Sequence, residues 1–433
     1  MAANARPVST RLASSPSQSP APSAPSLVLL ALLPIILSLL FLTFLALQNL
    51  LPRSFTLSLP FPFSLLIPQK LGGYSHKTSV ESLHHTLTSL SAYRSSQQSS
   101  LSAKKRSFRT LGSTGKRYAQ ALGYQAKLEE ITRASATNAD LVDGLIGLGK
   151  RDFEGGWGWR KGAGGGRPEP GRVIEMLKHF VRDWSTEGVR ERSALFTPIL
   201  SQLEDLYPSM DNFERDNLRI LVPGCGLGRL AYEISDLGFD VDANDYSYFI
   251  ASRLIFKHTE SINEHRIFPN IHSFSHHRTA QDMIREVRFP DVLPKPTLLS
   301  FQPGDFLELY RQPEVYDAVV TLFFIDTAQD IVGYLETIYR ALKPGGYWIN
   351  EGPLLWAGNP RMECSLDEVL HLARMIGFEQ LDLRSVDSDY TGTLDGLFRY
   401  IYEAQYWVMI KPKLTLPDSD VVDPPSSSSS SSL

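Results

Sequence analysis

The chain has 433 residues, of which 42% are hydrophobic and 21% are charged, so a wholly disordered protein is excluded. The formal net charge of -4 provides no basic excess for binding a phosphate backbone, which argues against a nucleic-acid partner. Only two cysteines occur, Cys225 and Cys364, which excludes a disulfide framework and a cysteine-rich zinc module.

The N-terminal region divides into two parts of different composition. Residues 1–26 are rich in Ser, Pro and Ala and are predicted to be a disordered arm. Residues 27–47 contain no charge, and about 20 apolar residues suffice for a helix to cross a bilayer. We therefore expect one transmembrane helix that anchors a cytosolic catalytic part to a membrane. A cleaved signal is the weaker alternative because signal sequences have a shorter apolar region. A cytosolic or nuclear protein is the alternative location.

A helical segment is predicted next, over residues 79–171. Leu83, Leu87, Leu90 and Tyr93 recur at helical spacing, and the segment ends in a Gly-rich loop at 155–171. The basic side chains within residues 104–109 are interpreted as a solvated helix face, with contact to anionic lipid as the alternative.

Residues 172–412 alternate between short apolar runs and helical windows, which predicts a doubly wound, mostly parallel α/β sheet covered by helices on both faces. The expected strands are 218–222, 239–243, 297–301, 316–324 and 347–350, with edge strands at 378–383 and 400–410. Residues 413–433 form a Ser-rich tail that is predicted to be disordered.

A glycine-rich turn separates the first strand from the helix after it. Gly224, Gly226 and Gly228 form a G-x-G-x-G pattern, which lets the backbone approach a ligand closely, although a plain tight turn is the other interpretation. Asp245 ends the second strand, about 20 residues further on, where an acid suits a ribose diol. Both dinucleotides and S-adenosylmethionine are bound in this way.

Two later motifs distinguish between these cofactors. The turn Leu-Lys-Pro-Gly-Gly at 342–346, between a helix and a strand, is typical of Class I methyltransferases. Gly-Asp-Phe at 304–306 follows the third strand, where such enzymes place an acid near the adenine. No P-loop lysine follows the glycine turn, which argues against a nucleotide triphosphate. We therefore expect S-adenosyl-L-methionine as the cofactor.

The chain resembles the carnosine N-methyltransferase family over roughly residues 173–412. The matching motifs, in order, are Arg-Asp-Trp-Ser at 182–185, Pro-Gly-Cys-Gly-Leu-Gly-Arg-Leu at 223–230, Asn-Asp-Tyr-Ser at 244–247, Phe-Pro-Asp-Val at 289–292, Gly-Asp-Phe at 304–306, Phe-Phe-Ile-Asp-Thr-Ala at 323–328, Leu-Lys-Pro-Gly-Gly at 342–346, Trp-Ile-Asn at 348–350 and Gly-Pro-Leu-Leu at 352–355. The resemblance implies methylation of an imidazole nitrogen of carnosine or a related histidine-containing dipeptide, with S-adenosylmethionine as donor.

The resemblance also implies roles for individual residues at the cofactor. Arg182 would grip the methionine carboxylate, although a surface salt bridge is the alternative. Asp245 would bind the ribose, and Asp305 would lie on the adenine side. The implied cofactor-binding residues are His179, Arg182, Gly224, Gly226, Gly228, Asp245, Asp305 and Leu322.

On the substrate side, Asp326 matches the aspartate of the family that binds the substrate. It would accept the imidazole N–H, fix the tautomer and leave the other nitrogen free to attack. A structural aspartate or a helix cap is the alternative. Tyr400 or Tyr402 would line the substrate pocket, with core packing as the alternative for each.

Three positions depart from the family pattern. His179 replaces a glutamine and Leu322 often replaces a cysteine, whereas Ala357 stands where the family has a histidine that contacts the substrate. The loss of that histidine bears on the identity of the substrate. A methyltransferase of peptide or protein histidine, or a non-catalytic membrane-tethered protein that binds the cofactor, are the alternative functions. No metal site is predicted, because the histidines between 272 and 277 are too loosely spaced.

Overall fold

The computed structural model describes residues 76–157, 167–208, 212–295, 298–390 and 396–413. The predicted arm at 1–26, the predicted transmembrane helix at 27–47 and nearly all of the predicted tail lie outside these residues.

The expectation of a membrane anchor has to be corrected. Within the described part of the chain, no helix has the length and apolar character needed to cross a membrane. The longest helices there have 34 residues each, but both carry charged side chains along their length. The transmembrane helix in the predicted fold class, the membrane-anchored location and the membrane partner are therefore not supported.

The first described residues form a helical arm. Helices α2 (His76–Arg109) and α4 (Tyr124–Trp157) lie side by side and are joined through the short helix α3 (Ser113–Ala121). Leu83, Leu87, Leu90 and Tyr93 are fully or almost fully buried in a core that includes Leu145 of α4. The helical spacing in the sequence thus marks the face of α2 that packs.

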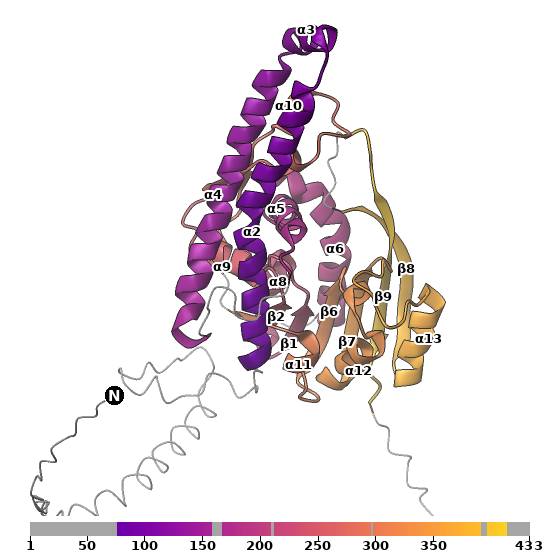
Figure 1. Ribbon diagram of the computed structural model, residues 1–433. Helices are drawn as coiled ribbons and strands as arrows, with labels where there is room; N and C mark the ends of the chain where they lie inside the picture. The colour runs from indigo at the N-terminus through magenta and orange to yellow at the C-terminus, as the bar shows by residue number, and fades with distance from the viewer. Residues whose placement is uncertain (1–75, 158–166, 209–211, 296–297, 391–395, 414–433) are drawn as a thin grey trace, which may run out of the picture. The chain divides into compact units, whose positions relative to one another are not determined.

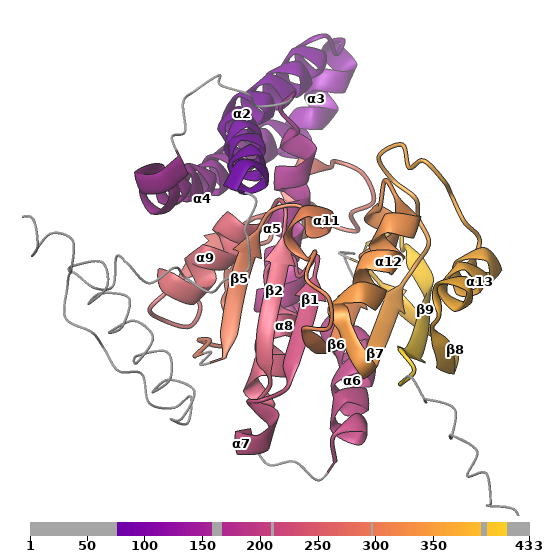
Figure 2. The same ribbon diagram turned by 90° about the horizontal axis from the view of Figure 1, so that it is seen from below.

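The rest of the described chain is a seven-stranded sheet with helices on both faces (Figure 2). Its strands are β1 (Arg219–Pro223), β2 (Asp240–Asp245), β5 (Leu299–Pro303), β6 (Tyr316–Leu322), β7 (Leu342–Gly352), β8 (Glu379–Asp389) and β9 (Ile401–Ile410). Their order is β5-β2-β1-β6-β7-β9-β8, and β9 runs antiparallel to both of its neighbours while the other pairs are parallel. This mixed α/β sheet is the Class I methyltransferase-like part of the predicted fold, which is confirmed.

The two faces of the sheet follow from the alternation of side chains along each strand. On β6, Val320 packs toward the core that contains α6 (Val189–Leu206) and α8 (Arg229–Asp236), whereas Val319 packs toward the opposite core. The helices of that opposite face are α11 (Phe306–Leu309), α12 (Ile331–Ala341) and α13 (Leu366–Ile376).

The remaining elements lie between those already described. They are α5 (Pro170–Trp184), η2 (Thr186–Gly188), α7 (Asn212–Arg215), α9 (Phe249–Lys257), η3 (Pro269–His272), α10 (Ala280–Met283), η4 (Ile325–Thr327) and a two-stranded antiparallel sheet of β3 (His265–Ile267) and β4 (Val287–Phe289). The sequence did not predict β3 and β4, because three residues are too few to display an alternating pattern.

Candidate active site

A cavity of about 720 Å³ opens at the carboxyl ends of the parallel strands. Gly224 follows β1, Asp245 ends β2 and Leu322 ends β6, and all three line the cavity. The chain order reverses between β1 and β6, since β2 lies on one side of β1 and β7 on the far side of β6. Open parallel sheets bind ligands at such a reversal point.

The three glycines of the turn after β1 serve different purposes, although all have positive φ angles. A Cβ atom on Gly224 would lie 2.3 Å from the Phe324 ring, and one on Gly228 would lie 2.6 Å from the Phe301 ring. Gly228 therefore allows close packing and does not line the cavity. Gly226 faces polar atoms instead.

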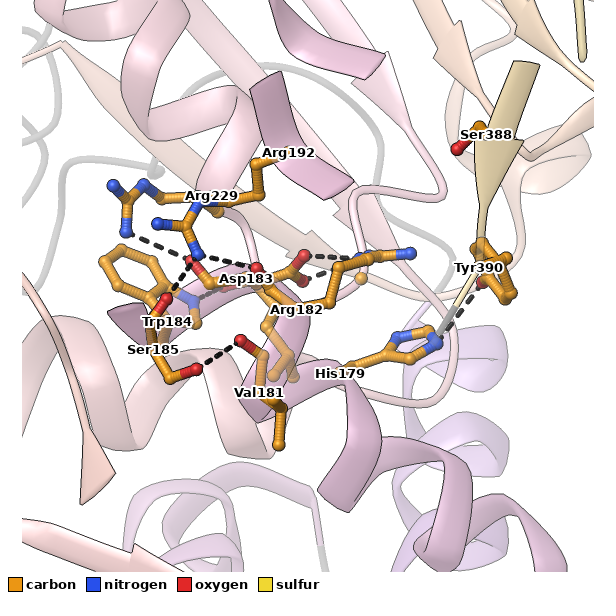
Figure 3. A network of polar contacts seen from close by, with 12 residues as sticks. His179, Val181, Arg182, Asp183, Trp184, Ser185, Arg192, Arg229, Ser388 and Tyr390 are labelled. Atoms are coloured by element: carbon orange, nitrogen blue, oxygen red, sulfur yellow. Dashed lines mark hydrogen bonds and ion pairs between the residues drawn. The ribbon is translucent and has the colours of Figure 1, made fainter. Parts of the chain in front are cut away.

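A polar trio of His179, Arg182 and Asp183 surrounds Gly226. The position of a Cβ on Gly226 lies 3.6 Å from Arg182 Nη2, 3.8 Å from Asp183 Oδ2 and 3.8 Å from His179 Nδ1. Arg182 donates to the two Asp183 carboxylate oxygens at 2.6 and 3.1 Å. All three side chains are buried at the end of α5 (Figure 3).

His179 is held by a residue from the far end of the chain. Its Nε2 atom lies 3.2 Å from the hydroxyl of Tyr390, and Figure 3 shows the two side chains pointing toward each other. Its Nδ1 atom is buried and has no hydrogen-bond partner among the described residues. Burial, and then the charge of Arg182, keep the pKa of His179 well below its usual range, so the ring is neutral. His179 and Arg182 line the cavity, and a guanidinium in such a place can bind the carboxylate of an amino acid.

The backbone that carries the polar trio is fixed by two further arginines and one acid. Asp291 accepts from Arg192 of α6 and from Arg229 of α8, each at 2.6 Å. Arg192 also donates to the carbonyl oxygen of Arg182 at 2.6 Å, and Arg229 donates to that of Asp183 at 3.0 Å. Arg192 therefore holds the end of α5 against α6, and Arg229 holds it against α8, the helix that follows the glycine turn (Figure 3).

Asp245 and Asp305 both line the cavity. Asp245 accepts from the N–H groups of Ser247 at 2.7 Å, Tyr248 at 2.6 Å and Gly226 at 3.1 Å. Burial raises the pKa of Asp245, and these three N–H groups oppose that shift. Asp305 caps α11 by accepting from the N–H of Leu307 at 2.8 Å.

Asp326, Tyr400 and Tyr402 do not line this cavity but form a second group beside it, the substrate cluster. Asp326 lies in η4, is buried, and accepts from the Leu355 N–H at 3.0 Å. Burial raises its pKa to about 6. The Tyr400 and Tyr402 rings lie 4.7 Å apart, and burial, Tyr400 and the Asp326 charge raise the pKa of Tyr402 to about 12. Tyr400 is half exposed and Tyr402 is partly buried.

Two aromatic residues to which the sequence analysis assigned no role join the substrate cluster to the cavity. Phe323 and Tyr390 both line the cavity, and their rings stack at 4.5 Å with an interplanar angle of 15°. The Phe323 ring also meets the Tyr402 ring edge-on at 5.6 Å. Phe323 has a φ of 49°, a left-handed conformation that is strained for a bulky side chain. Phe323 begins the Phe-Phe-Ile-Asp-Thr-Ala motif at 323–328, whereas no sequence signal marks Tyr390.

The residues near the missing family histidine do not replace it. Ala357 is exposed in the segment after β7. Glu351 is fully buried, and neither of its carboxyl oxygens has a hydrogen-bond partner among the described residues. Burial raises the pKa of Glu351 to about 8.

The described residues contain no group of three or more His, Cys, Asp or Glu side chains that could hold a metal ion.

Comparison with known proteins identifies the family. A model described as "Carnosine N-methyltransferase" matches residues 169–413. The carnosine N-methyltransferase of Schizosaccharomyces pombe is 39% identical over 261 residues, covering 55% of this chain and 70% of that protein. The Mus musculus enzyme of the same name is 38% identical over 254 residues, which cover 56% of this chain. The match covers 63% of the length of the mouse protein, slightly less than two thirds. With more than half of the chain matched, the protein belongs to the carnosine N-methyltransferase family, whose members use S-adenosylmethionine.

Proposed function

We propose that this enzyme transfers a methyl group from S-adenosylmethionine to an imidazole nitrogen of carnosine or a related histidine-containing dipeptide. The proposal rests on one observation: the residues assigned to the cofactor and those assigned to the substrate lie next to each other. His179, Arg182 and Asp245 line the cavity, and the substrate cluster adjoins it through Phe323 and Tyr390. We assign residues 172–412 to the methyltransferase domain and 79–171 to the helical segment before it.

The cofactor side needs groups of both charges. When bound, S-adenosylmethionine supplies an electrophilic methyl group on a positively charged sulfur. Arg182 would bind its carboxylate through a planar guanidinium, which Asp183 holds in place by accepting from it with both carboxylate oxygens. Asp245 would accept from the ribose hydroxyls, while Asp305 would face the adenine side. The neutral His179 ring would add no positive charge to the cavity when the cofactor is bound.

The substrate side needs an acceptor for one ring nitrogen. The Asp326 carboxylate would accept the imidazole N–H, so that the lone pair of the other nitrogen faces the methyl group. Methyl transfer makes the ring positive, and the same carboxylate would stabilise that charge and receive the N–H proton. Because the pKa of Asp326 is about 6, the carboxylate is mostly ionised at neutral pH.

Holding the reacting atoms in the correct orientation would supply much of the remaining rate enhancement. Transfer from a sulfonium requires nucleophile, carbon and sulfur to lie in one line, and holding them there removes a large entropic cost. The stacked Phe323 and Tyr390 rings, with Tyr402 edge-on, would form the wall that excludes water between the two binding regions.

The decisive test is methyl transfer by the full-length protein from labelled S-adenosylmethionine to carnosine, homocarnosine, free histidine and a peptide with an internal histidine. Mass spectrometry and NMR would identify the product and the methylated nitrogen. We expect methylation of one or both dipeptides. Turnover of the internal histidine alone, or of no imidazole compound, would refute the dipeptide assignment.

A further inference from the structure

One face of α2 carries a row of hydroxyl groups that the proposed reaction does not use. Ser82, Thr86, Ser89 and Tyr93 follow one another at steps of four, three and four residues, so they lie on one side of the helix. All four are buried, with exposed fractions of 0%, 6%, 4% and 0%. Buried hydroxyls lower stability unless they are hydrogen-bonded, so their partners show what the row is for.

Each hydroxyl meets a different point outside the arm. Ser82 donates to the carbonyl oxygen of Tyr246, and Thr86 donates to that of Ser247 at 3.3 Å. Ser89 accepts from the N–H of Glu169 at 3.1 Å, just before α5. The Tyr93 hydroxyl lies 2.7 Å from His272 Nε2. The first two bonds are notable because they hold consecutive carbonyl groups of one short loop.

That loop, residues 246–248, follows Asp245 directly and lines the cavity. Its N–H groups at Ser247 and Tyr248 donate to Asp245 Oδ1, at 2.7 and 2.6 Å. The loop is therefore bound to α2 through its carbonyl groups and to the Asp245 carboxylate through its N–H groups. Arg172 adds a third constraint, since its Nη1 atom donates to Ser247 Oγ at 3.1 Å.

We propose that Ser82 and Thr86 are positioning residues of the cofactor site: they fix the 246–248 loop and, through it, the orientation of the Asp245 carboxylate. The helical arm thereby contributes to cofactor affinity, although it lies before residues 169–413, where the family match is found. The inference depends on S-adenosylmethionine as cofactor and is independent of the identity of the methyl acceptor.

The test measures binding of S-adenosylhomocysteine to the full-length protein by calorimetry. The double variant Ser82→Ala/Thr86→Ala removes both bonds to the loop and should raise Kd about tenfold. Ser95→Ala is the matched control, because Ser95 is exposed on the same helix and its hydroxyl donates only to the Ala92 carbonyl, at 3.1 Å. The control should bind with wild-type affinity.

Two further variants separate positioning from a general loss of stability. Thr86→Val keeps the side-chain shape and removes one hydroxyl, so Kd should rise about threefold, whereas Thr86→Ser keeps the hydroxyl and should bind normally. With an accepted imidazole substrate, the KM for S-adenosylmethionine should rise while kcat at saturating cofactor stays near the wild-type value. Unchanged Kd in the double variant and in Thr86→Val would overturn the proposal, even if their melting temperatures fall. Because the ligand is S-adenosylhomocysteine, failure of the dipeptide assignment would not affect this result.

Discussion

The Oδ2 atom of Asp326 accepts a hydrogen bond from the backbone N–H of Leu355 at 3.0 Å. The carboxylate assigned to the substrate thus also holds the start of the segment after β7. Ala357 lies two residues further on, where the family has its histidine. One acid therefore connects the proposed imidazole site to the segment that carries Ala357.

Replacing Asp326 by Asn should separate catalysis from cofactor binding. The amide oxygen can still accept from Leu355, so the fold is preserved, but the negative charge is lost. Turnover of the imidazole substrate should fall by roughly one to several orders of magnitude. Steady-state kinetics and calorimetry with S-adenosylhomocysteine would measure the two effects. Wild-type turnover in this variant would show that Asp326 is only structural.

The pH profile of kcat/KM should contain two ionisations on its acid side. Asp326 has a pKa of about 6, and an imidazole substrate has a reference pKa of about 6.5. Both groups react in their deprotonated forms, so the rate should rise with pH and level off above about pH 7. Well below both values, log(kcat/KM) should change with a slope near 2, and near 1 in Asp326→Asn. Identical slopes in the two proteins would contradict the role of Asp326.

Asp245→Ala should weaken cofactor binding. It removes a charged hydrogen-bond acceptor that also receives three backbone N–H groups, a loss of roughly 1.5–3 kcal/mol. Calorimetry should show a Kd for S-adenosylhomocysteine about 10- to 100-fold above the wild-type value. Neither protein should bind NAD, which serves as the negative ligand. Binding of NAD by the wild type, without S-adenosylhomocysteine, would overturn the cofactor assignment.

Glu351→Gln should stabilise the protein at alkaline pH. Burial raises the pKa of Glu351 from 4.5 to about 8 in the folded state, so the folded protein binds a proton there that the unfolded chain has lost. Stability contributed by this group therefore falls as pH rises from about 4.5 to 8 and is lowest above that range. Melting temperatures measured at pH 5 and pH 9 should show a gain for the variant only at pH 9. An equal change in melting temperature at pH 5 and at pH 9 would mean that Glu351 does not titrate between these two pH values.

The sequence was most informative where the determining contacts are local. The glycine turn, Asp245 and the buried strand of residues 316–322 are each visible in a few consecutive residues. The hydrogen bond between Tyr390 and His179 could not be predicted from the sequence, because these residues are 211 positions apart. The left-handed Phe323 likewise arises from tertiary packing. Asp326, Tyr400 and Tyr402 were assigned to the substrate side from the resemblance alone, and their place beside the cavity depends on contacts between distant parts of the chain.

The position of β9 has a consequence for how the enzyme is completed during synthesis. β9 is the last strand of the described chain, yet it lies inside the sheet between β7 and β8. Until it inserts, β7 and β8 expose unpaired backbone edges, which can pair with other chains. Tyr402 arrives with the same strand. In a nascent chain these edges would stay unpaired until residues 401–410 emerge, and Tyr402 would join the substrate cluster only when β9 pairs with β7 and β8.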